Sequence, residues 1–238
     1  MRAIVTLLAL AATPVQSEEA TDSFVEANLL SIFYHELGHA LIDVMHLPVF
    51  GQEEDAADTA SILLIDSTFE NETAIEIAYD AALGFQAEAG ETANDIAWSD
   101  VHGPDLQRFY NLVCLFYGAD PDNRDDFADD MNLPTDRAEG CEDEFNLAND
   151  SWGPVFDEIT AHGGGKSLTY SSSVDNFTAN IISAEVKALN AQLQLPSDIK
   201  VSVESCGEAN AFYDPQDQSI VICTEFETHL RDISPAFR

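Results

Sequence analysis

The segment His35-Glu36-Leu37-Gly38-His39 constrains this chain more than any other, because its spacing carries chemical meaning on a helix. Side chains four residues apart lie on one face of an α-helix, about one turn from each other. Two imidazoles placed in this way can bind one Zn²⁺ at about 2.0–2.1 Å. Glu36 can then serve as general base toward a water activated by the metal. The segment predicts a metal-binding helix; the alternative is a chance match on an ordinary amphipathic helix.

The residues around this segment favour a helix with two different faces. Apolar residues recur at helical spacing on the side away from the two histidines: Phe33, Leu37, Ala40, Leu41 and Val44. Gly38 lowers helix stability, but its missing side chain lets another segment approach closely. The helix is expected to end before Pro48. One face would therefore pack into a core while the other holds a metal.

A catalytic zinc needs a third protein ligand and one open coordination position. Glu54 is the best candidate, at the start of a second predicted helix. Asp58 lies one turn further along the same face. It would orient a ligand histidine by a hydrogen bond, without binding the metal itself. The neighbouring carboxylates of Glu53 and Asp55 leave the ligand assignment open by one residue.

These two motifs resemble those of zincin metallopeptidases whose third zinc ligand is a glutamate. More closely, the chain resembles a family of secreted bacterial proteins classed as metallopeptidases of undetermined substrate. The matching segments are 33–42, 50–58, 107–111, 133–138 and 206–215. The resemblance implies a zincin-like fold with one Zn²⁺ per chain, bound by His35, His39 and Glu54, with Glu36 as catalytic base. It also implies hydrolysis of peptide bonds in a peptide or protein substrate.

Length and composition fit an α+β domain that is mainly helical. A chain of 238 residues with 45% hydrophobic residues suits one medium-sized domain with a substantial core. We expect a single zincin-like domain over 18–238, helical from 24 to 195, with a β-hairpin unit at 198–226. With 9 basic and 44 acidic residues, the formal charge is −35. This charge argues against nucleic acid and anionic membranes as partners, because their phosphates would be repelled.

The first 17 residues have the features of a secretory signal. Arg2 supplies a positive start, residues 3–12 form a short apolar run, and Val15-Gln16-Ser17 offers a cleavage site after Ser17. The apolar run is far shorter than the roughly 20 residues of a membrane span. We therefore expect a secreted or periplasmic protein with no membrane contact after cleavage; a weak anchor formed by the uncleaved run is the alternative.

The four cysteines agree with export, and they allow three pairings. Proximity in sequence favours Cys114 with Cys141 and Cys206 with Cys223, since each pair then encloses one local unit. The chain has no C-x-x-C motif, which argues against a cysteine zinc site or a redox pair. Four free thiols are the alternative if the protein is not exported.

The C-terminal region predicts a β-hairpin. Ile199, Val201 and Val203 alternate with polar residues, as in a half-buried strand. A turn at 214–217 precedes a second apolar strand at 219–223, and the Cys206–Cys223 disulfide would close the unit. The strands that border the substrate in zincins would then come from the C-terminal end of the chain, after the metal helix.

The segment Asn210-Ala211-Phe212-Tyr213 resembles the edge strand of thermolysin-like peptidases. The resemblance implies that Asn210, Ala211 and Tyr213 bind substrate, with an extended peptide adding to the sheet edge through backbone hydrogen bonds. A purely structural hairpin is the alternative. Candidates for stabilising the oxyanion of the reaction are His102, Arg108, Tyr110 and Tyr213.

Three other functions remain open from the sequence. The chain could be a metal-stabilised protein that binds peptides without cutting them, a zinc hydrolase acting on another amide, or a structural acidic protein. The presence of Glu36 favours catalysis over binding alone, because a binding protein does not need that carboxylate.

Overall fold

A computed structural model of the chain describes residues 14–93 and 96–234. The described part is mainly helical with one small mixed sheet, which confirms the predicted α+β class. The helices are α1 (Pro14–Val44), α2 (Glu53–Thr68), α3 (Asn71–Thr92), α4 (Asp105–Ala119), α5 (Asp125–Asp130), α6 (Thr135–Ala138), α7 (Cys141–Thr160), α8 (Phe177–Gln192) and α9 (Glu225–Ile233). The strands are β1 (Leu168–Ser172), β2 (Ile199–Glu204), β3 (Ala211–Asp214) and β4 (Ser219–Cys223).

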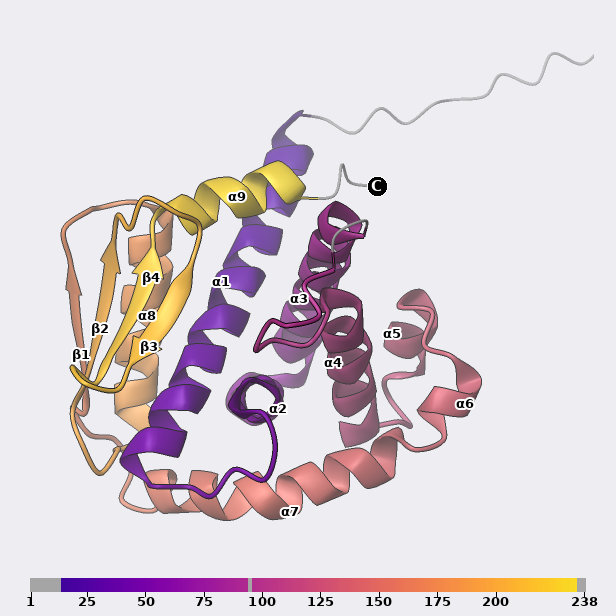
Figure 1. Cartoon of the computed structure of the whole chain (residues 1–238), viewed down its shortest axis with the longest axis horizontal. Helices are drawn as coiled ribbons and strands as arrows, with labels where there is room; N and C mark the ends of the chain where they lie inside the picture. Colours follow the sequence, from indigo (N-terminus) through magenta and orange to yellow (C-terminus); the bar gives the residue numbers. More distant parts are fainter. Residues whose placement is uncertain (1–13, 94–95, 235–238) are drawn as a thin grey trace, which may run out of the picture.

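Helix α1 lies at the centre of the molecule. In Figure 1 it passes between the sheet on one side and helices α2 and α3 on the other. The apolar face predicted from the sequence is buried, with Phe33, Leu37 and Leu41 fully inaccessible to solvent. The helix ends at Val44, before Pro48, as predicted. Because α1 is central, its opposite face, which carries both histidines, packs against α2 and β3.

A close approach between α1 and α2 depends on Gly38. A Cβ atom built on Gly38 would lie 3.0 Å from the Ala57 Cα and 3.1 Å from the Ala57 oxygen. Contacts this short are tighter than nine in ten Cβ contacts in real structures, so a side chain at this position would push the two helices apart by a few tenths of an ångström. This confirms the close approach predicted for Gly38, and it brings the first turn of α2 against the histidine face of α1.

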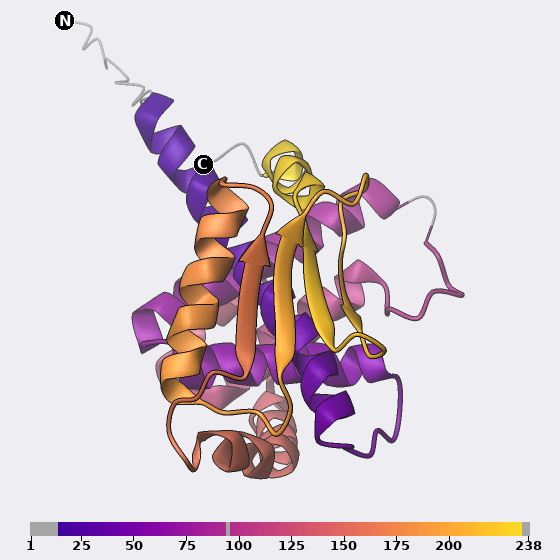
Figure 2. The same ribbon diagram turned by 90° about the vertical axis from the view of Figure 1, so that its left-hand side faces the viewer.

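The sheet has the strand order β1-β2-β4-β3, and Figure 2 shows it on one side of the molecule. Strand β2 is parallel to β1 and to β4, whereas β3 and β4 form the antiparallel hairpin. The predicted pairing of 199–203 with 219–223 as a hairpin is therefore wrong. Strand β3 lies between them in sequence and reverses the chain, so β4 runs parallel to β2.

Strand β3 forms one edge of the sheet, and its pairing leaves part of its backbone open. The Cys223 N–H donates to the Asn210 oxygen at 3.0 Å, and Ala211 is opposite Ile222. In an antiparallel ladder, hydrogen-bonded pairs alternate with non-hydrogen-bonded pairs. The N–H and C=O groups of Ala211 and Tyr213 consequently point away from β4. The Ala211 N–H donates to Asn210 Oδ1 at 2.9 Å, and the Tyr213 N–H donates to Glu36 on α1.

Both predicted disulfides are present. Cys114–Cys141 joins α4 to α7, and Cys206–Cys223 joins the segment after β2 to the end of β4. Within residues 14–93 and 96–234, no helix has the length and apolar character required to cross a bilayer. The predicted signal segment lies mostly outside the described residues, and only its last four residues fall in α1.

Candidate active site

Three potential metal ligands converge where α1 meets the start of α2. The Nε2 atoms of His35 and His39 lie 3.2 Å apart. Glu54 Oε2 is 3.3 Å from His35 Nε2 and 3.1 Å from His39 Nε2. The helical spacing of the histidines and the Gly38 crossing together place these atoms at the corners of a small triangle.

The triangle has the dimensions and the chemistry of a zinc site. Ligand atoms about 2.0–2.1 Å from a tetrahedral zinc ion lie about 3.3–3.4 Å from one another. The three separations of 3.1–3.3 Å are close to that spacing. Two imidazoles and one carboxylate are also a donor set that catalytic zinc uses, with the fourth position open. The residues therefore fit a single zinc ion.

The Nδ1 atom of each histidine lies within hydrogen-bonding distance of a carboxylate. Asp58 Oδ1 is 2.7 Å from His35 Nδ1, the contact predicted for Asp58. Glu53 Oε1 is 2.8 Å from His39 Nδ1. A proton on each Nδ1 would be shared with these carboxylates, leaving the Nε2 lone pairs directed at the centre. Of the adjacent carboxylates at the start of α2, Glu54 thus faces both Nε2 atoms, and Glu53 faces the far side of one ring.

Arg108 on α4 supports this arrangement in a way that the sequence did not indicate. Its Nε and Nη2 atoms donate to the two oxygens of Asp58, each at 2.8 Å. The guanidinium also lies 4.5 Å from the centre of the Phe85 ring. Although burial opposes it, the hydrogen bonds from Arg108 and His35 hold the pKa of Asp58 far below its usual value. Arg108 therefore keeps Asp58 ionised behind His35.

The electrostatics of the group favour a cation at its centre. Hydrogen bonding to His35 lowers the pKa of Glu54 to about 2, with further lowering by the charges of His39 and His102. Burial by itself lowers the pKa of His35, but hydrogen bonds to Asp58 and Glu54 outweigh it and raise this pKa to about 9. The carboxylates thus stabilise positive charge on the ring, as they would stabilise a metal ion beside it.

Glu36 is buried on α1, between the histidine group and β3. Burial raises its pKa, while the charges of His35 and His39 and the backbone N–H of Tyr213 act in the opposite direction. A carboxylate whose pKa is raised accepts and returns a proton more readily near neutral pH. Glu36 is thus a buried carboxyl group with a raised pKa, next to both histidines and to β3.

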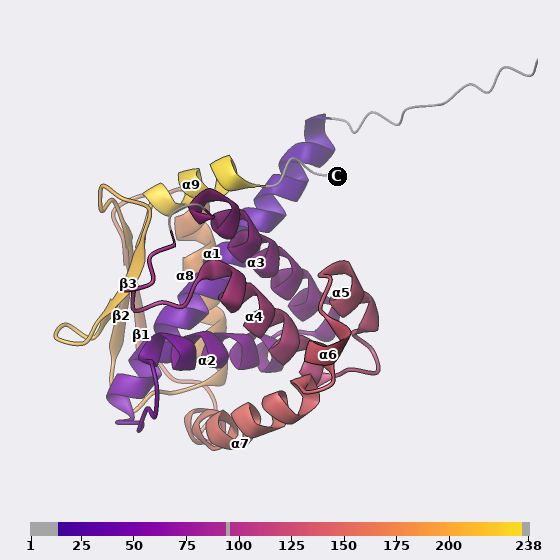
Figure 3. The ribbon, with the colours of Figure 1, turned by 45° about the vertical axis from the view of Figure 1, so that its right-hand side comes forward.

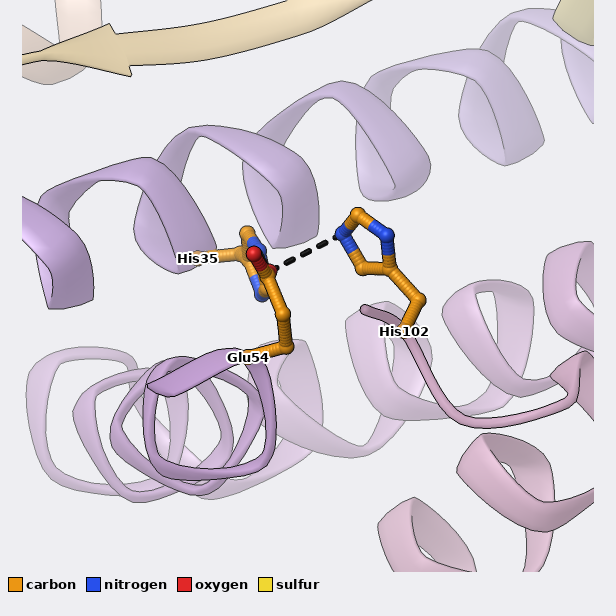
Figure 4. Close-up of side chains that lie close together, drawn as sticks. All are labelled: His35, Glu54 and His102. Atoms are coloured by element: carbon orange, nitrogen blue, oxygen red, sulfur yellow. Dashed lines mark ion pairs between the residues drawn. The ribbon is translucent and has the colours of Figure 1, made fainter. Parts of the chain in front are cut away.

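His102 reaches the same centre from the segment before α4. Its Nε2 atom is 2.9 Å from Glu54 Oε2, and Figure 4 shows its ring directed at that carboxylate. Asp100 Oδ1 lies 3.1 Å from the other ring nitrogen and accepts the His102 backbone N–H at 3.0 Å. In Figure 3 this segment extends from α4 toward β3. Unlike His35, His102 is substantially exposed, with 42% of its side chain accessible.

The predicted substrate residues line an open groove beside the group. The groove has a volume of about 660 Å³ and includes Asn210, Ala211 and Tyr213 together with His35 and Glu36. The Tyr213 hydroxyl donates to Asp43 on α1 at 2.7 Å, which fixes β3 against α1. His39, Glu54 and His102 line the same groove, but two of the predicted oxyanion donors do not. Arg108 is bound to Asp58, and Tyr110 packs against Phe109.

A family comparison agrees with this geometry. The sequence profile of a family described as "Putative metallopeptidase" matches residues 6–155 and 171–236. The chain belongs to this family. The matched ranges contain His35, Glu36, His39 and Glu54 as well as β3. No curated protein and no solved structure gives a significant match. Membership implies a metal and peptidase chemistry, and the histidine group is a place where this chain can hold such a metal.

Proposed function

We propose that the protein is a zinc-dependent peptidase, with one Zn²⁺ bound by His35, His39 and Glu54. The observation that carries this proposal is the triangle of two Nε2 atoms and one carboxylate oxygen, 3.1–3.3 Å apart, beside a buried Glu36. Asp58 and Glu53 contact the Nδ1 atoms of the two imidazoles and orient the rings, as carboxylates do at zinc sites. When bound, zinc supplies Lewis acidity, which lowers the pKa of a water molecule and polarises a carbonyl group.

Glu36 is the proton carrier in the proposed reaction. It takes a proton from the water that attacks the peptide carbonyl and then passes that proton to the leaving amine. The backbone N–H of Tyr213 donates to its carboxylate and keeps it directed toward the substrate edge. His102 lies next to Glu54 with one ring nitrogen aimed at the centre. We assign it the role of donor to the oxyanion that forms on the substrate.

The proposed substrate is a peptide or an unfolded protein segment in extended form. The C=O groups of Ala211 and Tyr213 point away from β4 and can accept hydrogen bonds from such a chain, as in strand addition to a sheet edge. The Ala211 N–H already donates to the Asn210 side chain, and the Tyr213 N–H donates to Glu36. The groove along β3 gives the chain room beside the metal group. The two disulfides agree with the further proposal that the protein acts outside the cytoplasm, in the periplasm or after secretion.

Two measurements test the proposal: the zinc content of the purified protein, and the change in kcat when Glu36 is replaced. We expect about one zinc per chain in the purified protein, and cleavage of a generic unfolded protein. Glu36→Gln should keep the zinc and lower kcat by about 10²–10⁴-fold, because the proton carrier is lost. Glu26→Gln is the matched control: it makes the same change on an exposed position of α1 and should leave both values unaltered.

Two results would contradict the proposal. Absence of zinc after incubation with Zn²⁺ and dialysis would remove the metal centre and favour a structural protein. Bound zinc with peptide capture but no cleavage, equal in the wild type and in Glu36→Gln, would instead establish a metal-stabilised peptide-binding protein.

A further inference from the structure

A second cavity adjoins the candidate active site on the side away from the groove. It has a volume of about 250 Å³ and lies between α1, α3 and α9. Its walls include six hydrophobic residues: Ile32, Ala81, Phe85, Phe226, Leu230 and Ile233. We refer to it as the α9 pocket. Cavities that hold a whole drug-sized ligand measure about 300–1,000 Å³, so the α9 pocket suits a single side chain.

The α9 pocket and the groove meet at the candidate metal centre. Both are lined by the same five residues: His35, Glu36, His102, Asn210 and Ala211. From there the groove continues along α1 to His46 and along β3 to Pro215. The α9 pocket continues in the opposite direction along α1, to Asn28. A peptide lying along β3 would therefore cross the metal centre between the two cavities.

The direction of β3 decides which part of a substrate faces each cavity. The strand begins at the α9 pocket, beside Ala211, and runs toward Pro215 at the far end of the groove. Antiparallel pairing, the commoner arrangement, places the N-terminal part of a substrate in the groove and its C-terminal part at the α9 pocket. The residue that contributes the amine of the scissile bond then lies against the α9 pocket. Glu36, the proposed proton donor to that amine, forms part of the same wall.

Several polar groups in the wall of the α9 pocket are already engaged. The Asn28 amide donates to the Phe24 and Asp80 carbonyls at 2.8 and 2.9 Å. Arg108 is paired with Asp58, and Glu88 Oε1 is 2.6 Å from His229 Nε2. An acidic substrate side chain would be repelled by the carboxylates in this wall, and a basic one would have to compete with Arg108 and His229 for Asp58 and Glu88. An apolar side chain would instead be buried against the six hydrophobic residues.

We propose that the α9 pocket selects an aliphatic or aromatic side chain on the residue that contributes the amine of the scissile bond. This inference rests on the proposed peptidase function and adds its substrate class. Helix α9 is the wall that sets the size of the accepted side chain, because it supplies Phe226, Leu230 and Ile233 at successive turns.

The test uses the zinc-loaded protein and a mixture of peptides, with cleavage sites mapped by mass spectrometry. We expect kcat/KM for leucine or phenylalanine after the cut bond to exceed that for glycine, aspartate or lysine by about tenfold or more. Ile233→Trp adds bulk to the wall and should shift the preference toward valine and alanine. Phe226→Ala enlarges the pocket and should shift it toward larger aromatic residues. Thr228→Trp, at an exposed position of the same helix, should leave the preference unchanged.

Cleavage with no preference on the amine side, or with a preference that neither wall variant alters, would overturn the inference and leave the peptidase proposal intact. Failure to cleave any peptide would count against the peptidase proposal alone. In that case the α9 pocket is judged by calorimetric titration with leucyl-alanine amide and glycyl-alanine amide. Binding of the leucyl compound at least tenfold more tightly, abolished by Ile233→Trp, supports the pocket, whereas equal binding by the two compounds overturns it.

Discussion

The part of the chain that the structure describes carries two groups of histidine and glutamate side chains, and the two groups differ in the contacts that hold them in place. One is the α1–α2 group of His35, His39 and Glu54. The other, which we call the α3–α9 group, consists of Glu88, Glu91 and His229, whose potential ligand atoms lie within 4.8 Å of one another. By residue type alone, each group could bind a divalent cation.

Burial and support separate the two groups. In the α1–α2 group, the Nδ1 atom of each imidazole contacts a carboxylate. One of these carboxylates, that of Asp58, also accepts hydrogen bonds from Arg108. In the α3–α9 group, the His229 ring contacts Glu88 directly at 2.6 Å, and Glu91 is exposed. This contact is shorter than the 3.1–3.3 Å between Glu54 and the two imidazoles of the α1–α2 group, so it must lengthen before a metal ion can lie between the two atoms. The contacts to the second nitrogen of each imidazole, more than residue type, therefore distinguish the proposed metal centre from the α3–α9 group.

The largest expected difference between the two groups is in metal content. His39→Ala should reduce bound zinc from about one per chain to nearly none, because two ligands hold zinc much less tightly than three. His229→Ala should retain about one. Elemental analysis after dialysis measures both variants. Loss of zinc from His229→Ala with retention in His39→Ala would move the metal centre to the α3–α9 group.

The next effect is on the stability of the metal-free protein. Asp58→Ala leaves the buried charge of Arg108 without its partner, which should lower the free energy of unfolding by about 3 kcal/mol. The corresponding change in the other group, Glu88→Ala, breaks a half-exposed pair with His229 and should cost at most about 1 kcal/mol. Urea unfolding in the presence of a chelator gives both values. Equal losses would show that the two groups are supported equally well.

A smaller effect, on zinc affinity, is expected when the Asp58 carboxylate that contacts His35 Nδ1 is replaced by an uncharged amide. Asp58→Asn preserves the size of the side chain but weakens its hold on the imidazole, so the Kd for zinc should rise by about 10–100-fold. Glu88→Gln should leave the Kd unchanged. Competition with a coloured chelator measures both, and an unaltered Kd in Asp58→Asn would refute the support assigned to this residue.

The smallest effect should follow from Glu53→Gln. The side chain of Glu53 is 53% exposed, compared with 19% for that of Asp58, so water can replace its contact with His39. The Kd for zinc should therefore rise by less than about tenfold. The same chelator competition applies. A rise as large as that of Asp58→Asn would mean that exposure does not govern the strength of this support.

Much of the site could be predicted because its parts are local in sequence. The helical spacing of His35 and His39 requires only the geometry of one helix, and the proposed roles of Glu54 and Asp58 need only a second helix. Gly38 marked the place where the two helices approach. The disulfide pairs were also predictable, since each encloses a short segment of chain.

The rest of the site could not be predicted because it depends on contacts between distant segments. Arg108 is 50 residues from Asp58, and no local pattern links them. Strand β1 was missed because it is short and mostly polar, with Leu168 as its only fully buried residue. The hairpin partner of β4 was misassigned, because alternation of side chains identifies a strand but does not identify its neighbour.

The sequence by itself determined the mainly helical class, the metal-type motif on α1, the disulfide pairs and the extreme acidity of the chain. Tertiary structure alone decided that α1 lies between the sheet and the other helices, that β3 forms the edge beside Glu36, and that α9 closes the pocket next to it. The physical reason is the range of the forces involved. Helical periodicity and hydrophobic patterning act over a few residues, whereas the packing of α9, β3 and Arg108 around α1 is fixed by burial of surfaces that meet only in the folded chain.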